Sequence, residues 1–205
     1  MRKSVVILCI VAFILSSCAS ERIITKFYVM DNVPEQPIDS SGTPTAALPY
    51  VVMVDNFSIS RIYDSNRIAL RTNSNEISYY IYHKWAENPS AALQTIVWRQ
   101  LRGLHLFQTC NLRRIEPEPN YKISGHIDRI ERVEQDDYDA AHVMITLQFK
   151  DYDTGEVLVQ HIYNRFTSLN EKDMNHFAKA LNQIIVEQNS VFFEKIRHYF
   201  ERQSQ

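Results

Sequence analysis

The sequence predicts an α+β fold of two layers, in which a mostly antiparallel or mixed β-sheet is covered by two α-helices. Apolar and polar residues alternate over 121–127 and 141–149, which is typical of strands with one face on a core and the other in solvent. Apolar residues recur at helical spacing over 93–104, and a longer stripe with the same spacing lies within 171–200.

The clearest strands are expected in the middle of the chain, at 121–127, 141–149 and 157–166, with a turn at Asp153–Glu156. Earlier strands are expected at 23–30, 50–57, 68–72 and 76–82, with a hairpin turn at Asn73–Asn75. Residues 107–112 return to the sheet. Four prolines punctuate a polar stretch and indicate a linker at about 33–49.

The first helix is expected to begin at Asn88 and Pro89. Asn is a favoured N-cap, and Pro at the first helical position loses nothing because its missing N–H would be unpaired there. Gly103 suits the end of this helix. Its apolar stripe consists of Leu93, Ile96, Val97, Leu101 and Leu104. Trp85 is expected to pack against the start of the helix, as apolar residues before an N-cap often do.

The last helix is expected over roughly 171–200, where Ser168 and Glu171 fit a capping box. Its apolar stripe is wide enough to lie across the sheet. The members of this stripe are Met174, Phe177, Ala178, Leu181, Ile184, Ile185, Val191, Phe192 and Ile196.

Four further apolar residues lie outside the two helical stripes. Val186, Phe193 and Phe200 recur every seven residues on the far side of the last helix, and Trp98 lies beside the stripe of the first. A single amphipathic face does not need them. They either contact another subunit or a partner protein, as exposed apolar patches do, or they are covered by the N-terminal segment or the linker.

The N-terminus has the composition of a secretory signal. Arg2 and Lys3 precede an apolar run over 5–15, which is shorter than the roughly 20 residues that span a bilayer. The following Leu15–Cys18 segment resembles the bacterial lipobox, whose cysteine receives the lipid; the alternative is an ordinary cleaved signal with an incidental cysteine. We expect a lipoprotein signal peptide at 1–17, a lipidated tether at 18–22 with the lipid on Cys18, and a single domain at 23–205.

The composition excludes several classes of function. The chain has 205 residues with 22 basic and 24 acidic side chains, so no basic excess exists for binding nucleic acid. The chain contains four glycines, too few to favour a glycine-rich phosphate-binding loop. The cysteine remaining in the domain, Cys110, is expected to be a buried, inert thiol without a disulfide.

No pattern of catalytic or metal-binding residues is found. The seven histidines form none of the usual zinc motifs, and no nucleophile motif is present. His126, His142 and His161 are expected on a solvated face of the sheet. We therefore expect no enzyme activity, no metal and no cofactor other than the covalent lipid on Cys18.

Two arginines flank the strand at 68–72. Arg67 and Arg71 either bind a carboxylate of a partner or pair with nearby acids such as Asp64 and Glu76. These arginines belong to a longer ordered pattern. It runs from Tyr63-Asp64 through Arg67 and Arg71 to Trp85-Ala86 and Pro89, and continues in Tyr121, Ile123, Gly125 and Ile127.

This order of motifs, together with the lipobox, resembles the ABC-type transport auxiliary lipoprotein family, the outer-membrane lipoproteins that accompany MCE-domain transport systems. The resemblance spans roughly 23–200. It implies a non-catalytic protein whose partner is an MCE-domain protein and, through it, an inner-membrane permease and an ATPase. Ala19 and Ser20, with no aspartate after Cys18, resemble the pattern of lipoproteins sorted to the outer membrane, facing the periplasm.

Two other functions are open to the sequence. The chain can be a lipid-anchored scaffold that binds peptidoglycan or an envelope protein complex without a role in transport. It can also be a periplasmic hydrolase, because catalytic triads need not be sequential.

Overall fold

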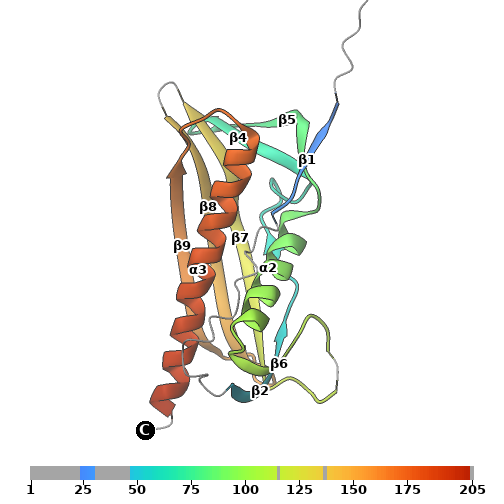
Figure 1. Cartoon of the computed structure of the whole chain (residues 1–205), viewed down its shortest axis with the longest axis vertical. Helices are drawn as coiled ribbons and strands as arrows, with labels where there is room; N and C mark the ends of the chain where they lie inside the picture. Colours follow the sequence, from blue (N-terminus) through green and yellow to red (C-terminus); the bar gives the residue numbers. More distant parts are fainter. Residues whose placement is uncertain (1–23, 31–46, 115, 136–137, 204–205) are drawn as a thin grey trace, which may run out of the picture.

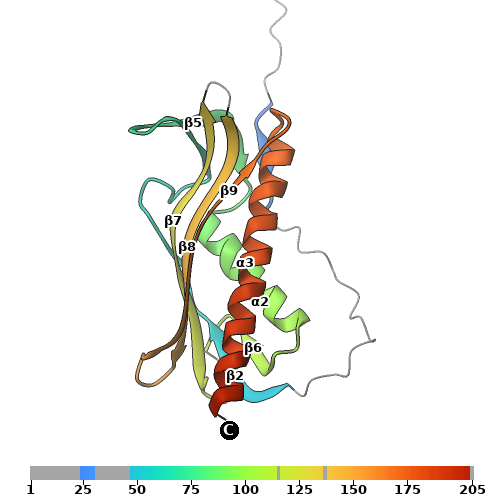
Figure 2. The ribbon, with the colours of Figure 1, turned by 90° about the vertical axis from the view of Figure 1, so that its left-hand side faces the viewer.

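The computed structural model describes residues 24–30, 47–114, 116–135 and 138–203. They form a single mixed sheet with two long helices packed on one of its faces (Figures 1 and 2). The predicted two-layer α+β architecture is thus confirmed. The expected signal peptide, the tether with Cys18 and most of the expected linker lie outside the described residues.

Three long antiparallel strands form one half of the sheet. β7 (Tyr121–Gln135) pairs with β8 (Tyr138–Asp151), which pairs with β9 (Val157–Ser168). Ile123, Ile127 and Ile145 are fully buried, as the alternating pattern predicts for the face on the core. The alternating pattern thus predicted a strand in each of these three places, but the prediction at 121–127 ended well before the observed end of β7 at Gln135.

The other edge of β7 is shared by three short strands that follow one another along it. β2 (Leu48–Val54), β3 (Ser58–Ile59) and β4 (Arg67–Asn73) all pair with β7 in parallel. Beyond them the sheet forks. β6 (Phe107–Asn111) adds in parallel to β2, while β5 (Glu76–Trp85) pairs antiparallel with β4 and carries β1 (Lys26–Tyr28) in parallel at the edge.

α2 (Pro89–Gly103) begins where the sequence predicts. The Asn88 side chain accepts a hydrogen bond from the Ser90 N–H at 2.9 Å, and Pro89 occupies the first turn. The stripe ends one residue early, however. Leu104 is 46% exposed because the helix stops at Gly103 and the chain turns through His105, which has a φ of 49°.

α3 (Met174–Gln203) starts later than predicted, and the expected capping box is wrong. Ser168 is still paired in β9, opposite Ala140. The carboxylate of Asp173 instead accepts hydrogen bonds from the N–H groups of Asn175 and His176, at 3.2 and 3.4 Å. Its position just before the first helical residue is that of an N-cap.

The two helices are joined by a buried pair of amides. The Asn189 Nδ2 donates to Gln100 Oε1 at 2.8 Å, and the Gln100 Nε2 donates to the carbonyl oxygen of Val186 at 3.0 Å. Since buried amides are costly when unpaired, these bonds fix how α2 and α3 are aligned.

The close packing of β7 on its neighbours generates a test at Gly125. A Cβ added there would lie 2.9 Å from the Phe57 ring and 3.1 Å from the carbonyl oxygen of Thr146. Gly125→Ala is therefore expected to lower the free energy of unfolding by about 1–3 kcal/mol, as overpacking does. Urea unfolding measures this change.

Gly103→Ala is the matched control, because a Cβ at that position meets nothing within 4 Å. In the last turn of α2, alanine is expected to leave stability unchanged or to raise it by up to about 1 kcal/mol. Equal effects of the two substitutions would contradict the packing assigned to Gly125.

Candidate functional site

A cluster of polar side chains is buried on the sheet face opposite the helices. The carboxylate of Glu131 on β7 has no exposed surface. Arg71 on β4 donates from Nε to its Oε1 at 2.8 Å, and the Tyr63 hydroxyl donates to its Oε2 at 2.6 Å. His142 on β8 contributes Nδ1, at 2.9 Å from the same Oε1. The Tyr63 loop and β4, 68 and 60 residues away in the sequence, and the neighbouring strand β8 thus converge on one carboxylate.

The electrostatics of the cluster favour an ionised Glu131. Burial alone raises the pKa of this carboxyl, but the hydrogen bonds from His142, Arg71 and Tyr63 outweigh it and lower the pKa to about 2. Burial and the adjacent carboxylate raise the pKa of Tyr63, which keeps its hydroxyl protonated as a donor. The hydrogen bond to Glu131 raises the pKa of Arg71.

A carboxylate, an imidazole and a phenol in contact could support acid–base chemistry, but this group is closed to a substrate. The Phe166 ring stacks on His142 with centroids 3.8 Å apart, and the His142 Nε2 lies 2.7 Å from Asn164 Oδ1. The side chain of His142 is 3% exposed. These contacts give the cluster a role in holding β4, β7, β8 and the loop at Tyr63 together.

Two of the three strand histidines therefore differ from the sequence prediction. His142 is buried in this cluster, and His161 is buried under α3, where Lys195 Nζ donates to its Nδ1 at 3.1 Å. Only His126 lies on a solvated part of the sheet, beside Ser58 at 2.8 Å. The three do not meet. His126 and His161 pair with Thr146 and Leu147, adjacent residues of β8 that face opposite sides of the sheet, and His142 lies at another level of the same strand.

The motif residues have structural contacts, but with other partners than the nearby acids. Arg71 pairs with Glu131, 60 positions away, and Arg67 lies over the Tyr79 ring with its guanidinium carbon 4.0 Å from the centroid. Asp64 accepts a hydrogen bond from the Asn88 Nδ2 at 2.8 Å. Asp64 therefore orients the N-cap of α2, which physically connects the first part of the motif to the Pro89 helix start.

Trp85 is the last residue of β5 and is buried in the core beside α3. Its ring is 1% exposed and lies 5.8 Å from the ring of Phe177 on α3, measured between centroids. Its backbone N–H donates to the carbonyl oxygen of Asn66 at 2.7 Å. Trp85 thus anchors the sheet to the long helix.

Of the two alternatives for the second apolar stripe on α3, a partner surface or a covered surface, the structure favours coverage for its two phenylalanines. Phe193 and Phe200 are 2% and 7% exposed and belong to the core of the monomer. Phe200 is surrounded by aromatic side chains of the sheet: Tyr50, Phe107, Tyr121 and Phe149. Aromatic side chains of the sheet thus cover Phe200, whereas Val191 of the first stripe is 44% exposed.

Trp98 and Val186 are half-buried against the same core. The Trp98 Nε1 donates to the carbonyl oxygen of Cys110 at 3.0 Å, and the Arg102 guanidinium lies 4.7 Å from the indole centroid. The Val186 carbonyl accepts from Gln100. The four residues that the sequence grouped therefore do not form one continuous outer surface.

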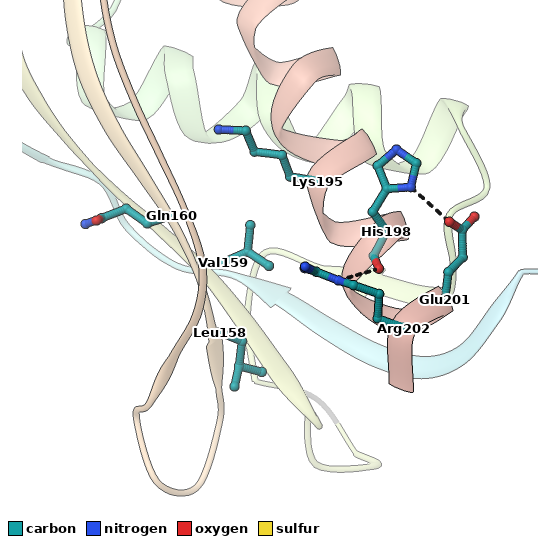
Figure 3. A pocket seen from close by; sticks show the side chains of 7 residues that line it. All are labelled: Leu158, Val159, Gln160, Lys195, His198, Glu201 and Arg202. Atoms are coloured by element: carbon teal, nitrogen blue, oxygen red, sulfur yellow. Dashed lines mark hydrogen bonds and ion pairs between the residues drawn. The ribbon is translucent and has the colours of Figure 1, made fainter. Parts of the chain in front are cut away.

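An open groove lies between the start of β9 and the last turns of α3 (Figure 3). Its volume is about 510 Å³. β9 contributes Leu158, Val159 and Gln160, of which Val159 points toward the helix and Gln160 away from it. α3 contributes Lys195, His198, Glu201 and Arg202.

The groove has an apolar wall and a mainly basic rim. His198 Nδ1 and Glu201 Oε2 are 2.9 Å apart, so that acid is engaged within the rim. Lys195 and Arg202 supply positive charge, although Lys195 Nζ also donates to His161 and Arg202 Nε to the carbonyl oxygen of His198. Such a surface can hold an extended segment that carries acidic groups beside apolar ones. No local sequence pattern indicates this groove, because its residues come from two elements that only the fold brings together.

Within residues 24–30, 47–114, 116–135 and 138–203, no three His, Cys, Asp or Glu side chains are grouped so that they could hold a metal ion. None of the helices described has the length and apolarity needed to cross a membrane. Cys110 is half-buried, and burial raises the pKa of its thiol to about 12.

The buried polar residues could have been suspected in part. Gln100 and Asn189 interrupt apolar stripes at positions where the helical spacing calls for an apolar side chain. Glu131 carries no such signal, because a β-bulge at Asp128 shifts the register between Ile127 and Arg129. His142 occupies a polar position of the alternation in β8, and that alternation does not show that the position is buried.

Together these features define an α+β domain whose clustered polar residues hold its own strands together and whose open groove suits a binding partner. The family of ABC-type transport auxiliary lipoprotein components matches residues 28–189, and this chain belongs to that family.

Two solved structures share the fold. A DUF330 protein from Xanthomonas campestris is 18% identical, with a TM-score of 0.66 over 79% of this chain and 97% of its own. An uncharacterized protein is 11% identical, with a TM-score of 0.61 over 74% of this chain and 95% of its own. No curated protein matches the sequence.

The buried cluster predicts a pH-dependent stability. Glu131→Gln is expected to lower the free energy of unfolding at pH 7 by about 3 kcal/mol, because Arg71 loses its buried anionic partner. The folded pKa of about 2 lies below the unfolded value of about 4.3, so the carboxylate stabilises the fold above the unfolded pKa. This stabilisation is lost as the pH falls through the folded pKa. Urea unfolding from pH 7 down to about pH 2 should show the gap between the two proteins narrowing below about pH 5.

Glu134→Gln is the control on the same strand. Glu134 pairs with Lys172 at 3.3 Å in an ion pair whose lysine is largely exposed, so a loss below about 1 kcal/mol is expected. A Glu131→Gln deficit that stays constant in acid would disprove the role assigned to the carboxylate.

Proposed function

We propose that this protein is a non-catalytic, lipid-anchored component of an ABC transport system, held in the outer membrane through Cys18 and docking an MCE-domain protein from the periplasmic side. Family membership over residues 28–189 carries the proposal. The Leu15–Cys18 segment, which resembles a lipobox, supplies the anchor, and an inner-membrane permease and ATPase supply the energy for moving apolar molecules.

The shape of the domain supports a bridging role. β1 lies at one end of the molecule, close in sequence to the anchor, while the C-terminal end of α3 and the basic groove lie at the other (Figure 1). The 30 residues of α3 span about 45 Å along this axis. A partner approaching from the periplasm would meet the groove end first.

The anchor is tested by Cys18→Ala. Two or more acyl chains hold a protein durably on a bilayer, so the variant is expected to move from the outer-membrane fraction to the soluble periplasmic fraction. Fractionation on a density gradient and incorporation of labelled palmitate measure this. Cys110→Ala should leave both unchanged, because Cys110 lies far along the chain from the lipobox. A Cys18→Ala protein that still sediments with the outer membrane would contradict the anchor.

The docking surface is tested by reversing charge in the groove. Lys195→Glu with Arg202→Glu is expected to reduce co-purification of the MCE-domain protein by about tenfold or more, since rim charges steer association and hold acidic segments. Lys179→Glu, an exposed lysine in the first half of the same helix, is the matched control. Equal recovery of the MCE-domain protein with the parent protein, the double variant and Lys179→Glu would exclude the groove as the docking surface. Recovery of peptidoglycan or other envelope proteins without an MCE protein would favour a scaffold role instead.

A further inference from the structure

Exposed apolar side chains lie on the paired strands β1 and β5 and on residues that flank β1. They are Ile24, Phe27, Val29, Ile81 and Tyr82, named here the β1–β5 patch. Ile24, Ile81 and Phe27 have the largest exposed fractions of all large hydrophobic side chains in the described residues, at 74%, 72% and 61%. Apolar groups gathered on an edge of a soluble domain usually meet another apolar surface.

A bulge in β5 turns part of this patch outward. Arg67 pairs with Lys84 while Ala69 pairs with Tyr79, so residues 80–83 leave the regular register with β4. Within the bulge, His83 faces the protein, and the Tyr28 hydroxyl lies 2.8 Å from its Nδ1. Ile81 and Tyr82 are left facing solvent beside the edge strand β1.

The patch lies close to the expected lipid. Only five residues separate Cys18 from Ile24. A fully extended chain covers about 3.3–3.6 Å per residue, so the Cα atoms of Cys18 and Ile24 are at most about 22 Å apart. β1 also lies at the end of the molecule opposite the groove (Figure 1). An acylated Cys18 would therefore hold this end at the bilayer surface.

The chemistry of the patch fits that surface. Its aliphatic and Phe side chains can enter the boundary between headgroups and acyl chains, and tyrosine is favoured at that depth. Lys26 is exposed on β1, and the partly exposed Lys84 lies opposite Phe27 in the pairing of β1 with β5. Lysines so placed can meet lipid phosphates.

We infer that the β1–β5 patch is a second membrane contact, which rests in the lipid interface beside the anchor and holds the domain with its groove end pointing away from the bilayer. This inference rests on the proposed anchor at Cys18. It adds an orientation that a flexible lipid tether alone would not impose.

The test uses full-length, lipidated protein with one added thiol at a time: Phe27→Cys, Ile81→Cys or Tyr82→Cys. Each thiol carries an environment-sensitive NBD fluorophore, and the proteins are reconstituted into vesicles of phosphatidylethanolamine and phosphatidylglycerol. Val157→Cys is the matched control, because Val157 is 43% exposed at the groove end of β9. The parent protein, in which the half-buried Cys110 is a free thiol, is labelled in the same way and controls for any signal from that position.

Labels in the patch are expected to show a several-fold rise in emission, a blue shift and loss of quenching by aqueous iodide on reconstitution, whereas the label at 157 stays unchanged. Thermal melts that match the parent protein show that each variant is folded.

The inference would be overturned if the protein floats with the vesicles while the patch labels keep the emission and iodide quenching of the control label at 157. That result would leave the anchor intact. A protein that does not float would refute the anchor, and the membrane contact with it. Patch labels that are shielded only after an MCE-domain protein is added would make the patch a protein interface and also overturn the inference.

Discussion

Strand β7 pairs with β8 along one edge and with β2, β3 and β4 in turn along the other, so the described sheet is held together through this one strand. Its 15 residues join two halves of the sheet. One half is the regular antiparallel group of β7, β8 and β9, and the other is the forked, largely parallel group of the remaining strands. Pairing along both edges leaves fewer backbone groups of β7 without a partner, which favours a fixed register for the strands attached to it.

The bulge at Asp128 divides β7 into two parts. Odd-numbered residues point to the helices before the bulge, and even-numbered residues do so after it. Before it, Ile127 points to the helices; after it, Ile130 takes that face and Glu131 points to the other. A buried carboxylate needs compensating partners, and Arg71, Tyr63 and His142 provide them. The shift of one residue thus accounts for a polar cluster that ties β4 and the Tyr63 loop to the centre of the sheet.

The same architecture separates two kinds of surface. The forked half carries β1 and β5, with their apolar side chains near the start of the domain, and the end of α3 carries the basic groove. The rigid sheet and the long helix between them keep these surfaces apart. A protein that connects a membrane to a partner in the periplasm would need such a separation.

The sequence alone determined the elements whose signals are local. The alternation in β7 and β8, the Asn88–Pro89 start of α2 and the apolar stripe of α3 each follow from side-chain periodicity or capping chemistry within one segment. The lipobox-like segment ending at Cys18 is local in the same sense. Only the tertiary structure decided which acid pairs with Arg71, that Phe193 and Phe200 are covered, and that β9 and α3 enclose a groove. Each of these depends on contacts between segments many residues apart. Strand pairing and a bulge set the register of those contacts, and the periodicity of the sequence does not report it.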